Sequence, residues 1–65
     1  MPESFQDRLL CEAVELDTKR AGLLLFLSTE AFTRLDTAEQ FRMRIQYSVM
    51  TLYSEILHQR IAALT

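Results

Sequence analysis

The nine residues "STEAFTRLD" at positions 28–36 determine the fold, because they separate two long stretches of helical hydrophobic periodicity. Ser28 is a suitable N-cap for a short helical turn that carries Phe32 toward the core. Asp36, followed three residues later by Glu39, is the capping signal of the next helix. A connection this short predicts that the two flanking helices are neighbours and run antiparallel.

The stretch before this connection predicts a first helix over about residues 5–27. Ser4 followed by Asp7 resembles a capping box and places the helix start near residue 5. Apolar residues then recur with the helical period, at Phe5, Leu9, Ala13, Leu16, Leu23 and Leu27. Gly22 costs roughly 1 kcal/mol relative to alanine within this helix, and we expect it to permit close approach by another backbone.

The stretch after the connection predicts a second helix over about residues 37–63, which contain neither glycine nor proline. Its apolar residues form two neighbouring stripes: Ile45, Val49, Leu52 and Ile56 on one, and Met50, Tyr53, Leu57, Ile61 and Leu64 on the other. Together the stripes cover a wider arc than packing against a single helix requires. We therefore expect this helix to contact at least two neighbours.

The chain has 65 residues, which allows one domain at most, a helical hairpin over residues 1–65. A single core of this size is marginal against the conformational entropy of folding. One cysteine and one histidine exclude a disulfide framework and a Cys/His metal cage within one chain. Five consecutive apolar residues, Leu23 to Leu27, point in all directions around the first helix. The sequence therefore predicts an all-α antiparallel helical hairpin with a short connecting helical turn, assembled into a homo-oligomer.

The same apolar run is far short of the about 20 residues that span a bilayer. The N-terminal segment "MPESFQDR" begins acidic rather than basic, unlike a signal peptide. We therefore expect no membrane partner and a cytoplasmic location, with which a lone thiol is compatible.

No group of residues has the composition and spacing of a catalytic or metal site. His58 has no second ligand or nucleophile within helical reach, and Cys11 has no adjacent base and looks like a packing residue. Among Glu12, Glu15 and Asp17, only the first two share a helix face, which is typical of a solvated surface. The one glycine lies inside a helix, so there is no glycine-rich phosphate loop. We expect a protein that is not an enzyme and carries no cofactor or metal.

The cationic residues suit a small anionic ligand better than a nucleic-acid polymer. The net charge is −2, whereas duplex binding requires a continuous basic face, so a polynucleotide is not an expected partner. Antiparallel helices place Phe5 and Arg8 near Arg60, which gathers an aromatic ring and two cations at one end. Lys19 lies eleven residues from Arg8, roughly 17 Å along the helix axis. We expect a neighbouring protomer to close this gap.

Several short segments along residues 5–61 occur in a recognisable order. They are "FQDR" at 5–8, Glu12, "LDTK" at 16–19, Leu24, Phe26, Phe32, Leu35, "EQ" at 39–40, Gln46, Met50, Tyr53, "IL" at 56–57 and "RI" at 60–61. Each element is weak alone, but their order is moderately specific. The chain resembles a family of short phage helical-hairpin proteins related to the phage inhibitors of CBASS and Thoeris immunity.

The resemblance implies a nucleotide sponge. Such proteins assemble, typically as hexamers, and sequester the cyclic di- or trinucleotide, or cyclic ADP-ribose-type, second messengers of bacterial defence without cleaving them. It also implies ligands between protomers, with aromatic rings stacked on bases and cationic side chains on phosphates. The corresponding residues are Lys19, Arg60 and Phe5; with Arg8 they form the four predicted ligand residues. Phe5 can stack on a base, but it has no hydroxyl to donate to a phosphate as a tyrosine would.

A second interpretation is an oligomer in the manner of the plasmid regulator Rop, with an RNA-binding or purely structural regulatory role. The turn of Rop also contains an "LD…EQ"-like segment, as do residues 35–40 here. RNA binding predicts a steep salt dependence, whereas a sponge binds a small ligand with a shallow salt response.

Overall fold

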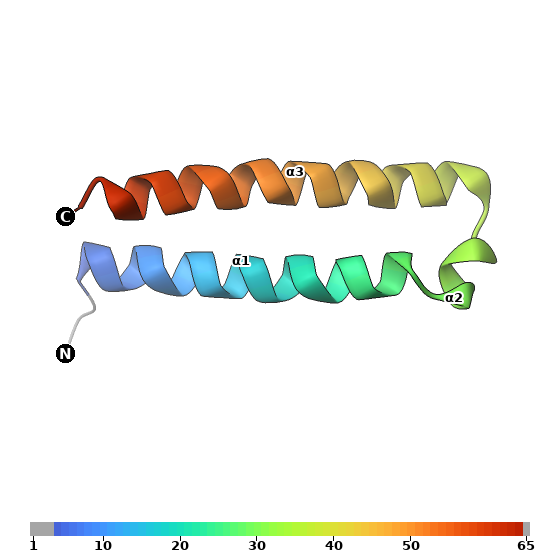
Figure 1. Ribbon diagram of the computed structural model, residues 1–65, viewed down its shortest axis with the longest axis horizontal. Coiled ribbons are helices and arrows are strands. Elements are labelled where there is room, and N and C mark those ends of the chain that lie inside the picture. Colours follow the sequence, from blue (N-terminus) through green and yellow to red (C-terminus); the bar gives the residue numbers. More distant parts are fainter. Residues whose placement is uncertain (1–3, 65) are drawn as a thin grey trace.

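A computed structural model of the protein describes residues 4–64, so the ends of the predicted domain, 1–3 and 65, lie outside the described residues. Two long helices, α1 (Phe5–Leu27) and α3 (Thr37–Ala62), lie side by side and antiparallel, and the short helix α2 (Glu30–Thr33) connects them at one end (Figure 1). The hairpin measures 45 × 22 × 15 Å. The predicted all-α fold with two packed long helices is confirmed.

Side-chain caps define where each helix begins. The Ser4 hydroxyl accepts a hydrogen bond from the Asp7 N–H at 3.0 Å, and the Asp36 carboxylate accepts one from the Glu39 N–H at 2.7 Å. Helix α2 is capped by Thr29, whose Oγ1 accepts the Phe32 N–H at 3.2 Å, and not by Ser28 as the sequence suggested. Ser28 ends α1 instead, because its own N–H still donates to the Leu25 carbonyl.

The core is a short apolar contact between the N-terminal half of α1 and the C-terminal half of α3. Leu9, Ala13 and Leu16 of α1 pack against Leu57 of α3, whose side chain is fully buried. Met50 and Ile61 extend this cluster along α3. At the other end of the hairpin, Phe32 of α2 is buried and its ring meets the Phe26 ring edge to face, with centroids 6.2 Å apart.

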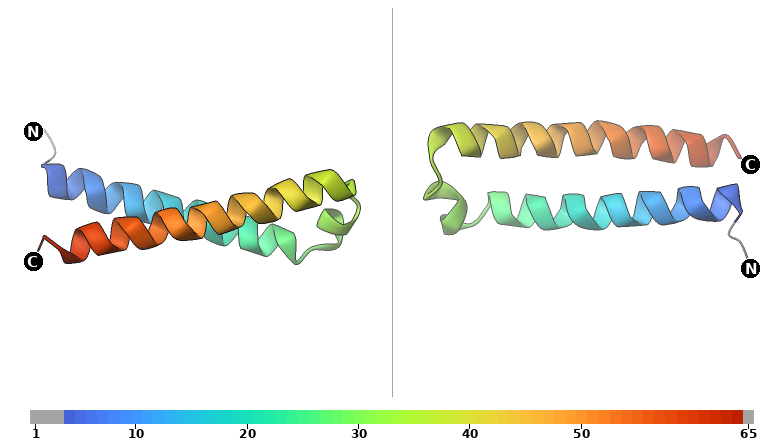
Figure 2. Two further views of the ribbon diagram at one scale, coloured as in Figure 1. Left: turned by 90° about the horizontal axis from the view of Figure 1, so that it is seen from above. Right: turned by 180° about the vertical axis from the view of Figure 1, so that it is seen from behind.

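The two apolar stripes of α3 have different environments. Leu57 is buried, and Met50 and Ile61 pack against the core, whereas Tyr53 and Leu64 of the same stripe remain exposed. The whole of the other stripe is exposed: Ile45, Val49, Leu52 and Ile56. A single hairpin therefore supplies α3 with one long neighbour, α1 (Figure 2). Six of the nine apolar side chains in the two stripes stay exposed.

The apolar run of α1 is likewise only partly covered. Leu23, Phe26 and Leu27 are half-buried, while Leu24 and Leu25 are exposed. No heavy atom lies within 4 Å of a Cβ built on Gly22, so the expected close approach at this glycine is not made within the hairpin. None of the helices in the described part of the chain is long and apolar enough to cross a membrane.

Candidate ligand-binding site

The start of α1 and the end of α3 bring two of the predicted ligand residues together. Phe5 is the first residue of α1, and Arg60 lies in the last turn of α3, where a cation is favoured by the helix dipole. The Arg60 guanidinium carbon is 5.8 Å from the centroid of the Phe5 ring, within the range of a cation–π contact. Both side chains are exposed, so this pair offers a ring and a guanidinium to a ligand.

Arg8 and Lys19 are the other predicted ligand residues, and both are exposed on α1. Eleven residues amount to about three helical turns, so the two side chains share one face of α1 but lie roughly 17 Å apart along its axis. Phe5 and Lys19 share that face as well, because fourteen residues are about four turns. The hairpin thus joins Phe5 with Arg60 at one end and leaves Lys19 near the middle, separate from them.

Three of the other cations form ion pairs with carboxylates, and the fourth, Arg44, lies over an aromatic ring as Arg60 does. Arg34 pairs with Glu30 at 3.6 Å, Arg42 with Glu39 at 2.9 Å, and Arg20 with Asp17 at 3.9 Å. The Arg44 guanidinium lies over the Phe32 ring at 5.2 Å. Within residues 4–64, the cations that form no ion pair with a carboxylate are Arg44 and the three predicted for the ligand, Arg8, Lys19 and Arg60.

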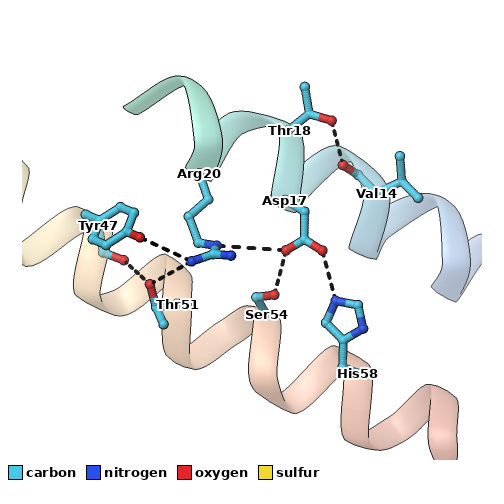
Figure 3. A network of polar contacts seen from close by, with 8 residues as sticks. All are labelled: Val14, Asp17, Thr18, Arg20, Tyr47, Thr51, Ser54 and His58. Carbon is cyan, nitrogen blue, oxygen red and sulfur yellow. Dashed lines mark hydrogen bonds and ion pairs between the residues drawn. The ribbon is translucent and has the colours of Figure 1, made fainter. Parts of the chain in front are cut away.

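A polar network connects the middle of α1 to α3 (Figure 3). The Ser54 hydroxyl donates to one oxygen of Asp17 at 2.6 Å, and the Nε2 of His58 donates to the other at 2.8 Å. The Arg20 guanidinium donates to the Tyr47 hydroxyl at 3.3 Å and to the Thr51 hydroxyl at 3.4 Å. Lys19 and Arg20 are adjacent in sequence, but Arg20 holds the hairpin together while Lys19 faces solvent.

Asp17, Ser54 and His58 are the residue types of a hydrolytic triad, but their arrangement differs from one. In a triad the histidine bonds both the nucleophile and the carboxylate, whereas here serine and histidine each bond the carboxylate. Ser54 is also buried, with 6% of its surface exposed. The hydrogen bonds of this group orient the two helices and do not activate a nucleophile.

Ser54 lowers the pKa of Asp17 from its usual value by donating a hydrogen bond to the carboxylate. The hydrogen bond from His58 adds to this lowering, as does the charge of Arg20, and desolvation opposes it only partly. A depressed pKa means that the ionised carboxylate stabilises the folded state. This contribution is present above the unfolded value of 3.8 and is lost as the pH falls toward the folded value.

We therefore expect Asp17→Asn to destabilise the hairpin most above pH 3.8 and progressively less below it. Thermal unfolding followed by circular dichroism from about pH 5 to about pH 2 measures this loss of stability. The difference in melting temperature between the wild type and Asp17→Asn should narrow as the wild-type carboxylate is protonated. Glu15→Gln, an exposed carboxylate two residues away, is the matched control and should show no such narrowing. A difference in melting temperature that stays constant to the lowest pH would show that the ionised Asp17 carboxylate does not stabilise the fold.

Hydrophobic periodicity does not predict this network, although the sequence contains a signal for it. Polar residues on α3 recur with helical spacing at Tyr47, Thr51, Ser54 and His58, beside the apolar stripe. Arg20 lies eleven residues after Leu9, about three turns, and so falls on the buried stripe of α1. A charged residue on such a stripe indicates a partner on the facing helix.

The sequence predicts that Cys11 is a packing residue. In the structure it is exposed on the outer side of α1 instead. With Leu10, Val14 and Glu15 it lines an open hollow of about 300 Å³ on that helix, away from α3. None of the described residues form a group of three or more His, Cys, Asp or Glu side chains that could hold a metal ion.

Comparison with known proteins gives one result. A family model described as Sequestin matches residues 3–63 of the chain. The matched range includes both long helices, the connection and all four predicted ligand residues. No curated protein and no solved structure matches the chain.

Proposed function

Because the chain belongs to the Sequestin family, we propose that it sequesters cyclic oligonucleotide or cyclic ADP-ribose-type second messengers of bacterial defence without cleaving them. The family name denotes sequestration, which agrees with a small protein that binds a ligand stoichiometrically. In this proposal the protein is phage-encoded, acts in the host cytoplasm and prevents the messenger from reaching its effector.

The observation that carries this proposal is an exposed ring with a cation against it, Phe5 and Arg60, on a hairpin whose described residues carry two further exposed and unpaired cations. Arg8, Lys19 and Arg60 have no carboxylate partner among residues 4–64, so their donors are available for phosphate oxygens. The Phe5 ring lies against the Arg60 guanidinium and supplies a flat apolar surface on which a base can stack. Cationic donors for phosphate and an aromatic ring for stacking are groups that nucleotide-binding sites use.

Stoichiometric capture without turnover agrees with the rest of the chain. Ser54 and His58, two residue types that can attack or activate a phosphodiester, each hydrogen-bond Asp17 instead of each other. The proposal therefore assigns the protein no enzymatic activity, no cofactor and no metal.

The proposed ligand site lies between protomers of a homo-oligomer, of which the hexamer of the resembled phage proteins is one form. Lys19 and Arg8 lie roughly 17 Å apart along α1, a span too long for both to hold one phosphate. A second hairpin beside the first can place one of its own cations closer to Lys19 than Arg8 of the same chain. The exposed apolar stripe of α3 offers the surface for such an association.

Isothermal titration calorimetry with cyclic dinucleotides, cyclic trinucleotides and cyclic ADP-ribose isomers tests the proposal. We expect saturable heat with at least one of them, at a fixed ratio of ligand to protomer. Chromatography of the ligand released by denaturing the complex should recover it unchanged. No heat with any member of the panel would overturn the proposed ligand class, and a hydrolysed ligand would overturn the sponge mechanism.

The Rop-like alternative is less well supported by the surface charges. Arg34 and Arg42 near the connection are paired with glutamates, which reduces the positive potential there. Titration at increasing salt separates the two functions, because polymer binding weakens steeply with salt and binding of one small ligand does so only slightly.

A further inference from the structure

The exposed stripe of α3 has the spacing of a coiled-coil seam. Ile45, Val49, Leu52 and Ile56 follow one another at intervals of four, three and four residues. Between 46% and 62% of the surface of each side chain is exposed in the hairpin. The exposed apolar residues of α1 form no comparable row, since the spacing from Leu10 and Val14 leads to Thr18.

The hairpin is also too open to be the final state of the chain. It exposes 5064 Å², whereas a folded monomer of 7.6 kDa typically exposes about 4,300 Å². Its radius of gyration is 15.0 Å, compared with about 11 Å for a compact domain of this length. A second copy packed on the α3 stripe would bury apolar surface that a single hairpin leaves exposed.

Charge selects the direction of the second copy. Arg42 precedes Val49 by one heptad and therefore lies on the same seam. Two parallel α3 helices would place Arg42 against the partner's Arg42, so two bulky guanidinium groups, each paired with its own Glu39, would meet at one level of the seam. Two antiparallel helices centred between Val49 and Leu52 place Arg42 opposite the partner's Gln59, and they also oppose the helix dipoles favourably.

We propose that α3 pairs antiparallel with α3 of a second copy, with Val49 facing the partner's Leu52 and Ile45 facing the partner's Ile56. The interface is isologous, so both copies contribute the same residues. The proposal rests on the homo-oligomer of the proposed function and specifies its face, its direction and its register. It requires no ligand.

Disulfide trapping tests both direction and register. Ile45→Cys and Ile56→Cys are made separately, each with Cys11→Ser to remove the native thiol, and are oxidised alone and after refolding as a mixture. In the antiparallel register, two copies of residue 45 lie about 17 Å apart along the seam, beyond the reach of a disulfide. We therefore expect a covalent dimer on a non-reducing gel from the mixture and almost none from either variant alone.

Dimers from each variant alone would show a parallel seam and overturn the proposal, as would the absence of dimers from the mixture.

Light scattering adds a second measurement. Val49→Glu should lower the mass in solution at least twofold while the helical circular dichroism is kept, whereas Thr18→Glu on the outer face of α1 should leave the mass unchanged. A wild-type monomer would also overturn the interface. If dimers are trapped but calorimetry detects no ligand binding, the interface is supported and only the proposed function is rejected.

Discussion

Leu57→Ala is expected to lower the free energy of unfolding by about 2–5 kcal/mol, the usual cost of removing a fully buried leucine side chain. Leu57 has no exposed surface and lies at the centre of the contact between α1 and α3. Each kcal/mol lowers the melting temperature of a domain this small by about 4–8 °C. Thermal and urea unfolding followed by circular dichroism should therefore show a loss of about ten degrees or more.

Leu25→Ala is the matched control for this experiment. It makes the same chemical change in α1 at a side chain that is 71% exposed, where substitutions usually change stability by less than about 0.5 kcal/mol. Equal losses in the two variants would show that the α1–α3 contact is not centred on Leu57.

Arg60→Ala is expected to weaken ligand binding roughly tenfold to a hundredfold. A hydrogen bond to a charged group contributes about 1.5–3 kcal/mol, and each 1.4 kcal/mol is about a factor of ten in affinity. Arg60 also lies against the Phe5 ring, so its removal leaves the stacking surface without its neighbouring cation. Calorimetry with the cyclic nucleotide that binds the wild-type protein measures the change.

Lys19→Ala should cause a loss of similar size if Lys19 contacts a phosphate of the same ligand. Arg34→Ala is the control, because Arg34 pairs with Glu30 at the opposite end of the hairpin and should leave affinity unchanged. Arg60→Lys separates charge from shape, since lysine keeps the charge but not the planar fork of donors. Unchanged affinity in both Arg60→Ala and Lys19→Ala, with the fold intact, would show that other residues bind the ligand.

Most of the secondary structure can be predicted from the sequence because its determinants are local. Ser4 and Asp36 satisfy N–H groups three residues ahead, and such caps can be recognised without any knowledge of the fold. The sequence predicts Ser28 as the cap of α2, whereas Thr29 has that role and Ser28 ends α1. Two adjacent residues can both cap here, and only the chain path distinguishes them. Helical boundaries of this kind shift by a residue or two for that reason.

The candidate site is only partly predictable. The proximity of Phe5 to Arg60 follows from antiparallel helices of similar length, and the structure shows it. The contacts of Asp17 with Ser54 and His58 join residues 37 and 41 positions apart. Their formation depends on the rotation of α3 about its own axis, which hydrophobic spacing alone leaves open between two adjacent stripes.

The pattern of residues thus specified two helices, their connection, their antiparallel direction and an excess of apolar surface. These properties depend on capping and periodicity, which act over three or four residues. Tertiary packing decided which of the two apolar stripes of α3 is covered. It also determined that Arg20 bridges the helices while Lys19 remains exposed. The physical reason is that α1 can cover only one side of α3, and the side that buries Leu57 also brings Asp17 within reach of Ser54 and His58.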